Sequence, residues 1–337
     1  SSPVQVPGTT WYAGTTIGTY SAAGIKSDGT LWAWGYNGYG QLGHGNTTDY
    51  SSPRQIPGTN WSRVSSYIGH DSVLATRTDG TLWAWGQNEY GQLGQNNKTN
   101  QSSPIQIPGT TWSSASYSIH QSGYYGMAIK TDGTLWMWGS NSGGMLGQSN
   151  QTQYSSPRQI PGTTWAKCGK GYNTTLALKT DNTGWSWGQN GYGDLGLGDK
   201  SQYSSPKQIS GSWKMLSGAD NSGMGIKTDG TLWGWGRNSQ GQLGLNQAYA
   251  PSGSSSGTPQ EVTGAGTTWD SIASGWGNFM FGKSDGTLWG VGNNDEGQFG
   301  KNNRTKYSSP VQIPGTVWAG FERVGGIGDI GFMLQEE

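Results

Sequence analysis

The sequence contains little of what enzymes, disulfide-rich proteins and nucleic-acid-binding proteins usually depend on. Its 337 residues include one cysteine and three histidines, and 12% of them are charged, with 20 basic and 20 acidic side chains. A single cysteine excludes an internal disulfide bond, and a chain with no basic excess has no overall electrostatic attraction to nucleic acid. No apolar run reaches the length of a membrane-spanning helix. We therefore expect no nucleic-acid partner and no membrane insertion.

Titratable side chains that could carry catalysis are also scarce. His44, His70 and His120 stand in different local contexts, without the spacing of a metal-binding motif. We expect all three in loops or on the surface, and we expect Cys168 to be a small buried side chain rather than a nucleophile. The sequence thus predicts a protein that is not an enzyme and that has no cofactor, no metal site and no catalytic residue.

Glycine and tryptophan, by contrast, are abundant, with 60 and 19 residues. Glycine is costly inside helices, whereas short strands joined by glycine-rich turns accommodate it. Residues 28–35 read Asp-Gly-Thr-Leu-Trp-Ala-Trp-Gly, and this phrase returns with variations about every 50 residues, which is typical of a repeat protein. The other copies begin at Asp79, Asp132, Asp181, Asp229 and Asp285.

Each repeat unit is predicted to contain four short strands. In the first unit, strands near residues 11–14 and 22–26 precede an Asp-Gly hairpin turn, and residues 31–34 and 51–56 form the third and fourth strands. Strand alternation places the paired tryptophans of the third strand on one face, and we expect them to pack as a core between neighbouring sheets. These core positions are Trp32, Trp34, Trp83, Trp85, Trp136, Trp138, Trp185, Trp187, Trp233, Trp235 and Trp289. Trp276 alone falls outside the repeat pattern.

One domain, residues 1–337, is expected. Its repeat units are predicted at residues 11–60, 61–111, 112–164, 165–212, 213–268 and 269–317. The chain opens at a fourth strand and stops after a second one, so residues 318–337 plus 1–10 are expected to join in a closing unit. That unit lacks a hairpin arm: it is incomplete, or a segment is missing from the sequence, or a partner supplies a strand.

A second phrase, Gly-Gln-Leu-Gly, follows the tryptophan pair at residues 40–43, 91–94 and 241–244. With the repeat length and a later Pro-x-Gln-Ile, it resembles the RCC1 repeat family over essentially the whole chain. The resemblance implies an all-β fold, a seven-bladed β-propeller whose seventh blade is formed from both termini. Members of that family include a nucleotide exchange factor for a small nuclear GTPase, which also binds chromatin, a secreted β-lactamase inhibitor, and bacterial and phage proteins. The near-identical units and polar loops are most similar to the bacterial or phage members.

Charged residues recur beside the hairpin turns. Each turn aspartate, such as Asp28, follows a base two positions earlier, such as Lys26, and we expect solvated hairpin ends with locally balanced charge. In the fourth unit Asn182 replaces the turn glycine, which is compatible with the same turn because asparagine tolerates positive φ. Another asparagine, such as Asn37, recurs after the tryptophan pair, where its side chain is expected to hold the loop backbone.

Tyrosines in the loops are the candidate ligand-binding residues. Tyr39, Tyr90 and Tyr192 follow the tryptophan strand, and Tyr249 lies in a longer loop of the fifth unit. A further set precedes the Ser-Ser-Pro of the fourth strand or its equivalent: Tyr50, Tyr154, Tyr203 and Tyr307. Rigid amphipathic rings beside Asn, Gln and Thr suit contacts with sugars or proteins. The alternative is that these rings pack between neighbouring blades.

The sequence therefore predicts a non-catalytic recognition or adhesion module that binds a carbohydrate or a protein through the loops of one propeller face. An alternative is a structural subunit of a virion or cell-surface assembly, which self-associates by strand addition at the open seventh blade. A third is an inhibitor-type binder of a secreted enzyme. Each role favours an extracellular, cell-surface or virion location, with a protein or a surface glycan as the partner.

Overall fold

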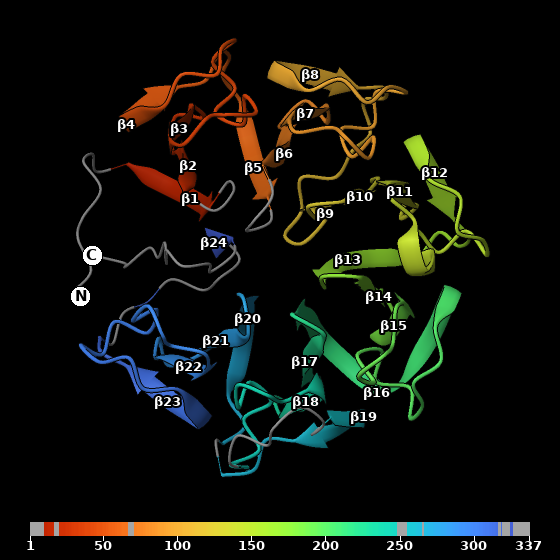
Figure 1. The fold of residues 1–337 in the computed structure, drawn as a ribbon, viewed down its shortest axis with the longest axis vertical. Coiled ribbons are helices and arrows are strands. Elements are labelled where there is room, and N and C mark those ends of the chain that lie inside the picture. The colour runs from red at the N-terminus through yellow and green to blue at the C-terminus, as the bar shows by residue number, and fades with distance from the viewer. Residues whose placement is uncertain are drawn as a thin grey trace.

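A computed structural model describes residues 10–16, 20–66, 71–247, 255–264, 266–315, 318 and 324–325. They form an all-β propeller in which short antiparallel sheets stand around a central axis (Figure 1). Six blades of four strands are built from these residues. The predicted closing blade lies mostly outside them, so its composition and the total of seven blades stay predictions.

The first three blades follow the predicted order of strands. The first blade contains β1 (Trp11–Thr16), β2 (Ser21–Lys26), β3 (Leu31–Gly35) and β4 (Tyr50–Gln55). The second contains β5 (Trp61–Ser66), β6 (Ser72–Arg77), β7 (Leu82–Gly86) and β8 (Gln101–Ile107). The third contains β9 (Ile119–Gln121), β10 (Tyr125–Ile129), β11 (Leu135–Gly139), a short 3-10 helix η1 (Ser142–Gly144) and β12 (Tyr154–Ile160).

The remaining blades repeat this order. The fourth contains β13 (Trp165–Lys170), β14 (Thr174–Lys179), β15 (Thr183–Gly188) and the first part of β16 (Tyr203–Ala219). The rest of β16 begins the fifth, with β17 (Ser222–Lys227), β18 (Leu232–Arg237) and β19 (Ser255–Glu261). The sixth contains β20 (Trp269–Ser274), β21 (Asn278–Lys283), β22 (Leu288–Gly292) and β23 (Tyr307–Ile313).

Two connections depart from the regular pattern. The 17-residue strand β16 serves as the outer strand of the fourth blade and the inner strand of the fifth, so both blades belong to one seven-stranded sheet. Where the first, second, third and sixth units have Pro-Gly, the middle of β16 has Ser210-Gly211, which keeps the backbone N–H that proline lacks. At the other end of the chain, β24 (Val324–Gly325) pairs in parallel with β1, with Gly14 opposite Val324.

The hairpin turns form as the sequence predicts. In the first unit, the backbone N–H and the hydroxyl of Thr30 donate hydrogen bonds to Asp28 Oδ1 at 3.0 and 2.7 Å. These bonds hold the pKa of the Asp28 carboxyl below its usual value. The turn glycine has φ of +78°, and its replacement Asn182 adopts φ of +64° in the same turn. The turn chemistry is therefore conserved around the ring even where glycine is not.

The bases beside the turns are packed more closely than the sequence suggests. Arg77 stacks between two indole rings, with its guanidinium carbon 4.3 Å from the centroids of both Trp61 and Trp83. The expectation of simply solvated, charge-balanced ends was incomplete, because each base lies opposite the first-strand tryptophan in the strand pairing, as Arg77 does opposite Trp61. The other units place Lys26, Lys130, Lys179, Lys227 and Lys283 in the same way.

We expect Arg77→Met to lower the free energy of unfolding by about 1 kcal/mol, because methionine keeps apolar contact with the indoles but loses the cation–π attraction. Arg77→Lys, which introduces the residue that the other units have at this position, should lower the free energy of unfolding much less. Urea unfolding followed by tryptophan fluorescence would measure both variants. Equal losses for Met and Lys would show that side-chain shape, and not charge, stabilises this position.

The paired tryptophans have different environments. The second one is buried in four described units and donates its indole N–H to a backbone carbonyl of the preceding blade; Trp85 donates to Gln41 O at 2.8 Å. Trp138, Trp187 and Trp235 make the equivalent bonds to Gln92, Met145 and Asp194. The first tryptophan, such as Trp83, is half-buried and donates to the turn threonine at 2.8 Å. The Gly-Gln-Leu-Gly phrase thus forms the socket that joins one blade to the next.

Candidate loop-face binding site

The propeller has two chemically different faces. Antiparallel strands reverse direction at each connection, so the Asp-Gly turns lie on one face and the connections before the second strand and after the third lie on the other. We call these the turn face and the loop face. The indoles of the turn face are stacked against Lys or Arg, as at Trp83. The loop face therefore has the more accessible aromatic surface.

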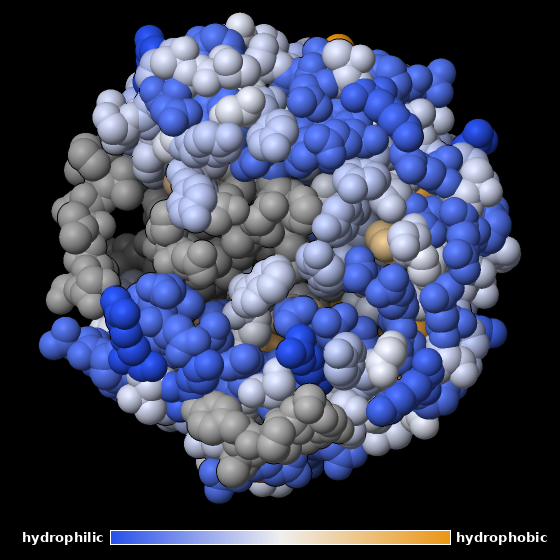
Figure 2. Space-filling view, in the orientation of Figure 1, coloured by the Kyte–Doolittle hydropathy of each residue, from blue (hydrophilic) through white to orange (hydrophobic). Residues whose placement is uncertain are grey.

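Exposed rings concentrate on the loop face. The large hydrophobic side chains that are exposed among the described residues are Tyr20, Tyr36, Tyr90, Tyr192 and Trp276, and all five belong to loop-face connections. Figure 2 shows the side on which η1 lies toward the viewer in Figure 1, a mainly hydrophilic surface with side chains of intermediate hydropathy scattered over it. Uncovered rings on a polar face are typical of a binding surface.

Four rings on this face form a continuous line, which we call the aromatic row. The ring of Tyr90 contacts Tyr124 at a centroid distance of 5.2 Å, Tyr124 contacts Tyr172 at 5.8 Å, and Tyr172 contacts Trp276 at 6.0 Å. The four residues come from the second, third, fourth and sixth blades. The row therefore includes no residue of the fifth blade and joins parts of the chain that are far apart in sequence.

The middle of the row is held by polar bonds as well as ring contacts. The hydroxyls of Tyr124 and Tyr172 lie 3.1 Å apart. Burial, with a smaller effect of the bond to Tyr172, raises the pKa of Tyr124 to about 12. Tyr124 thus stays neutral at physiological pH and offers the row an uncharged ring and hydroxyl group.

The predicted loop tyrosines are not gathered in one place. Tyr90 is one end of the aromatic row. Tyr192 is exposed on the fourth blade, 5.5 Å from the guanidinium of Arg237, and Tyr39 is half-buried on the first blade. Tyr249 lies outside the described residues. The sequence pattern identified one member of the row; the others lie in connections between the first and second strands, where no repeat motif points to them.

The second tyrosine set lies at the start of the outer strands, in contact with its own blade. Tyr50 packs against the hydrophobic core, its hydroxyl accepts a hydrogen bond from Asn46 Nδ2 at 3.1 Å, and Arg54 stacks on its ring at 4.2 Å. Tyr154, Tyr203 and Tyr307 make the corresponding hydroxyl bonds to Asn150, Asp199 and Asn303. These contacts favour a packing role for this set, but the hydroxyl bonds lie within one blade and not between neighbouring blades as the alternative expected.

One half-buried and one buried carboxylate, Asp71 and Asp194, lie beneath the loop face. Asp71 accepts a hydrogen bond from Gln41 Nε2 at 2.8 Å, and burial raises the pKa of Asp71 to about 6. Burial also raises the pKa of Asp194 to about 6, with nearby Asp220 adding to the effect. Asp194 takes the position that glutamine occupies in Gly-Gln-Leu-Gly. Its Oδ1 accepts the N–H of Tyr192 at 2.8 Å, whereas its buried Oδ2 has no hydrogen-bond partner in the structure.

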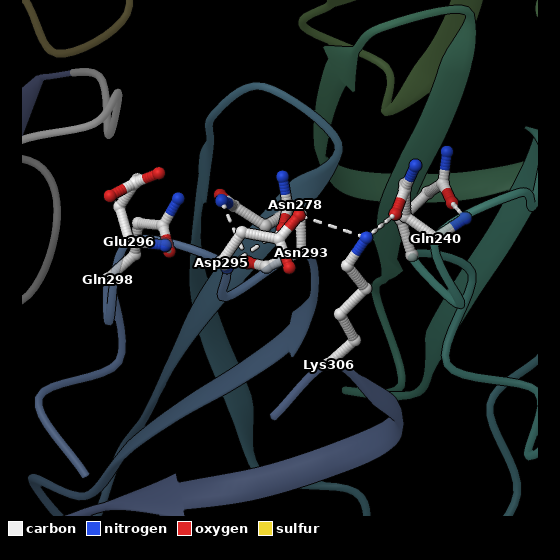
Figure 3. A network of polar contacts seen from close by, with 8 residues as sticks. Gln240, Asn278, Asn293, Asp295, Glu296, Gln298 and Lys306 are labelled. Carbon is white, nitrogen blue, oxygen red and sulfur yellow. Dashed lines mark hydrogen bonds and ion pairs between the residues drawn. The ribbon is translucent and has the colours of Figure 1, made fainter. Parts of the chain in front are cut away.

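Two of the bases on this face are already bound by carboxylates. Arg237 pairs with Asp220 at 3.0 Å. At the seam between the fifth and sixth blades, Lys306 bridges Asp295 at 2.9 Å and Gln240 at 2.7 Å (Figure 3). Figure 3 also shows the Asn278 side chain directed at the Asn293 carbonyl, a bond of 3.2 Å that ties two loop-face connections together. These bonds fix the loops that surround the aromatic row.

The histidines and the cysteine have structural positions. His44 bonds through Nε2 to the carbonyl of Arg54 at 3.2 Å, where other units use glutamine or lysine for the same bond. His120 is buried in β9, so its expected loop or surface position was wrong; His70 lies outside the described residues. Cys168 is a buried free thiol, and burial raises its pKa. Across the ranges that the structure covers, no cluster of three potential metal ligands occurs, and no helix there is long and apolar enough to cross a membrane.

Comparison with known proteins identifies relatives over parts of the chain. Human protein RCC2 is 33% identical over 137 residues, which are 40% of this chain and 26% of that protein. The human E3 ubiquitin-protein ligase HERC2 is 29% identical over 147 residues, 43% of this chain and 3% of the relative. The chain thus spans about a quarter or less of the length of these curated relatives. They are eukaryotic and do not support the expected similarity to bacterial or phage members.

Solved structures match the fold more completely. Prp20p from Saccharomyces cerevisiae superposes with a TM-score of 0.75 at 19% identity, over 89% of this chain and 76% of that one. Human WBSCR16 gives a TM-score of 0.78 at 17% identity, over 96% and 86% of the two chains. The model of the Regulator of chromosome condensation (RCC1) repeat matches residues 28–74, 79–119, 132–178, 181–218 and 229–281, more than half of the sequence. The chain therefore belongs to the RCC1 repeat family and has its β-propeller fold.

Proposed function

We propose that the protein is a non-catalytic recognition module that binds a protein partner through its loop face. The observation that carries this proposal is the difference between the two faces: rings such as Tyr90 and Trp276 are exposed on the loop face, whereas turn-face rings such as Trp83 are stacked against cations. Exposed tyrosine and tryptophan are the side chains that most often dominate protein interfaces. Their support on a rigid ring of sheets lowers the entropy lost on binding.

The relatives support a protein partner over a sugar. The structure of Prp20p was described with its binding properties to Gsp1p and histones, which are proteins. The carbohydrate-binding, adhesion, virion-subunit and enzyme-inhibitor roles expected from the sequence have no counterpart among the relatives described above. A glycan ligand therefore enters as an outcome of the test and not as the proposal.

Site-specific photocrosslinking would test which face is used. A benzophenone amino acid would replace Tyr36 or Tyr192 on the loop face, and Thr78 or Thr131 on the turn face as matched exposed controls. In an extract of the cells that produce the protein, we expect both loop-face positions to capture the same protein, identified by mass spectrometry, and the turn-face positions to capture none.

Capture of that protein from Thr78 or Thr131 alone would contradict the proposal. Binding to an array of immobilised glycans, without capture of any protein, would replace the protein partner with a carbohydrate. Both results are informative because all four positions are exposed and lie away from the buried tryptophan sockets.

A further inference from the structure

We infer that the aromatic row binds a basic segment of the partner, with Arg or Lys side chains placed over its two end rings. This inference rests on the proposed function, because it specifies the partner chemistry on the same face. The end rings are the most exposed of the row: Tyr90 is 36% exposed and Trp276 is 50% exposed. Trp276 is also the tryptophan that the repeat pattern leaves unexplained.

The charges around the row favour a cationic occupant. Among the described residues of the first-to-second-strand connections and the four residues that follow each third strand, acidic side chains outnumber basic ones. These residues include the acids Asp71, Glu89, Asp220, Asp295 and Glu296 and no base; Arg237, the last residue of β18, is paired with Asp220. Carboxylates beside aromatic faces strengthen the attraction of a cation to the rings.

Each end ring has acidic neighbours. Glu89 precedes Tyr90 in the chain and is exposed. The connection that carries Trp276 is bonded through Asn278 to Asn293, two residues before Asp295. Asp295 is paired with Lys306, and the next residue, Glu296, is exposed. A base over the Tyr90 end would therefore meet a ring that has an exposed carboxylate as its chain neighbour.

The length of the row sets the spacing of the bases. The three centroid separations of 5.2, 5.8 and 6.0 Å place the end rings at most about 17 Å apart, the reach of about five extended residues. Bases at positions i and i+4 of an extended segment lie on the same side of the strand, about 13 Å apart, and their long side chains cover the remainder. A segment with this spacing fits both ends of the row.

The test uses fluorescent synthetic peptides and the full chain. The first peptide, Gly-Ser-Arg-Ser-Gly-Ser-Arg-Ser-Gly, has arginines at i and i+4; a second has two adjacent arginines, and a third has glutamates in place of the arginines. By fluorescence anisotropy we expect the first to bind most tightly and the glutamate peptide not to bind. Trp276→Ser should weaken the affinity of the protein for the first peptide about tenfold, and Tyr90→Ser should weaken it by a similar factor.

Tyr192→Ser is the matched control, because Tyr192 has a similar exposure on the loop face but lies outside the row. This substitution should change the affinity for the first peptide by less than about twofold. Equal binding of the glutamate peptide, or an equal loss with Tyr192→Ser, would overturn the inference. Absence of peptide binding at about 1 mM, the weakest affinity of interest, would also overturn it. If loop-face crosslinks persist in that case, the proposed function stands and only the partner chemistry is wrong; if both are absent, both fail.

Discussion

Trp85→Ala should lower the free energy of unfolding by about 3–5 kcal/mol, the largest effect that we expect from a single substitution in this protein. Trp85 is completely buried, its ring lies 5.9 Å from that of Trp61, and its N–H bonds to the carbonyl of Gln41 in the preceding blade. Alanine would leave a cavity at the seam and a carbonyl without its donor. Urea unfolding followed by circular dichroism would measure the loss.

Two further variants separate the causes. Trp85→Phe keeps most of the apolar contact but removes the N–H, so it should lose about 1–3 kcal/mol for the unpaired carbonyl of Gln41. Trp276→Ala, in which the lost ring is 50% exposed, should change stability by less than about 0.5 kcal/mol. If Trp85→Ala were no more costly than Trp276→Ala, the socket would not be a stabilising joint between blades.

Asp194→Gln should stabilise the protein by about 2–3 kcal/mol at pH 8, an unusual direction for a substitution at a buried site. In four other units a glutamine fills this socket. In the first unit, the oxygen of Gln41 accepts the N–H of Tyr39, and its nitrogen donates to Asp71 of the next blade. Asp194 reproduces the first bond, but its second oxygen faces the Asp220 region without a donor. Glutamine would supply the missing donor and remove a buried charge.

The stabilisation should depend on pH in a defined direction. The pKa of Asp194 is about 6 in the folded protein against 3.8 for the ordinary side chain, so the folded state prefers the protonated form. The destabilisation by the ionised form is absent below pH 3.8, grows as pH rises, and is complete above pH 6. The difference between Asp194→Gln and the original protein should therefore be small at pH 3.5 and largest near pH 8.

Gln242→Glu is the reciprocal control, because it introduces a carboxylate into the equivalent socket of the next unit. It should lose stability at pH 8 and regain it at pH 3.5. Urea midpoints at the two pH values would compare the variants. A stabilisation by Asp194→Gln that is the same at both pH values would mean that side-chain length, and not charge, explains it.

The parts of the fold that were predictable are those that depend on neighbours in sequence. An Asp-Gly pair between alternating strands specifies its hairpin locally, and even the exception at Asn182 follows from the backbone preference of asparagine. Asn37 is similar: its side chain donates to the carbonyls of Asn46 and Thr48, each at 3.0 Å, within one loop. Such contacts are encoded within about a dozen residues, so a repeated sequence reveals them directly.

The candidate site could be predicted only in part, because its contacts are not local. Tyr172 and Trp276 meet although about a hundred residues separate them, and neither residue belongs to the repeat motif. Period-2 alternation says which face of a strand a side chain occupies, but not which loop from another blade it meets. Tyr90 was identifiable from its loop position, while its partner Tyr124 depended on the arrangement of the blades.

Continuous pairing through β16 has a mechanical consequence. At most junctions a pull on the chain ends would separate one sheet from the next, whereas the fourth and fifth blades share β16. Its first part, up to Ser212, pairs with β15, and the rest, from Trp213, pairs with β17. Tension along β16 therefore passes from one hydrogen-bond ladder directly into the next, with no loop between them, so these two blades should rupture together, as a single element of the ring.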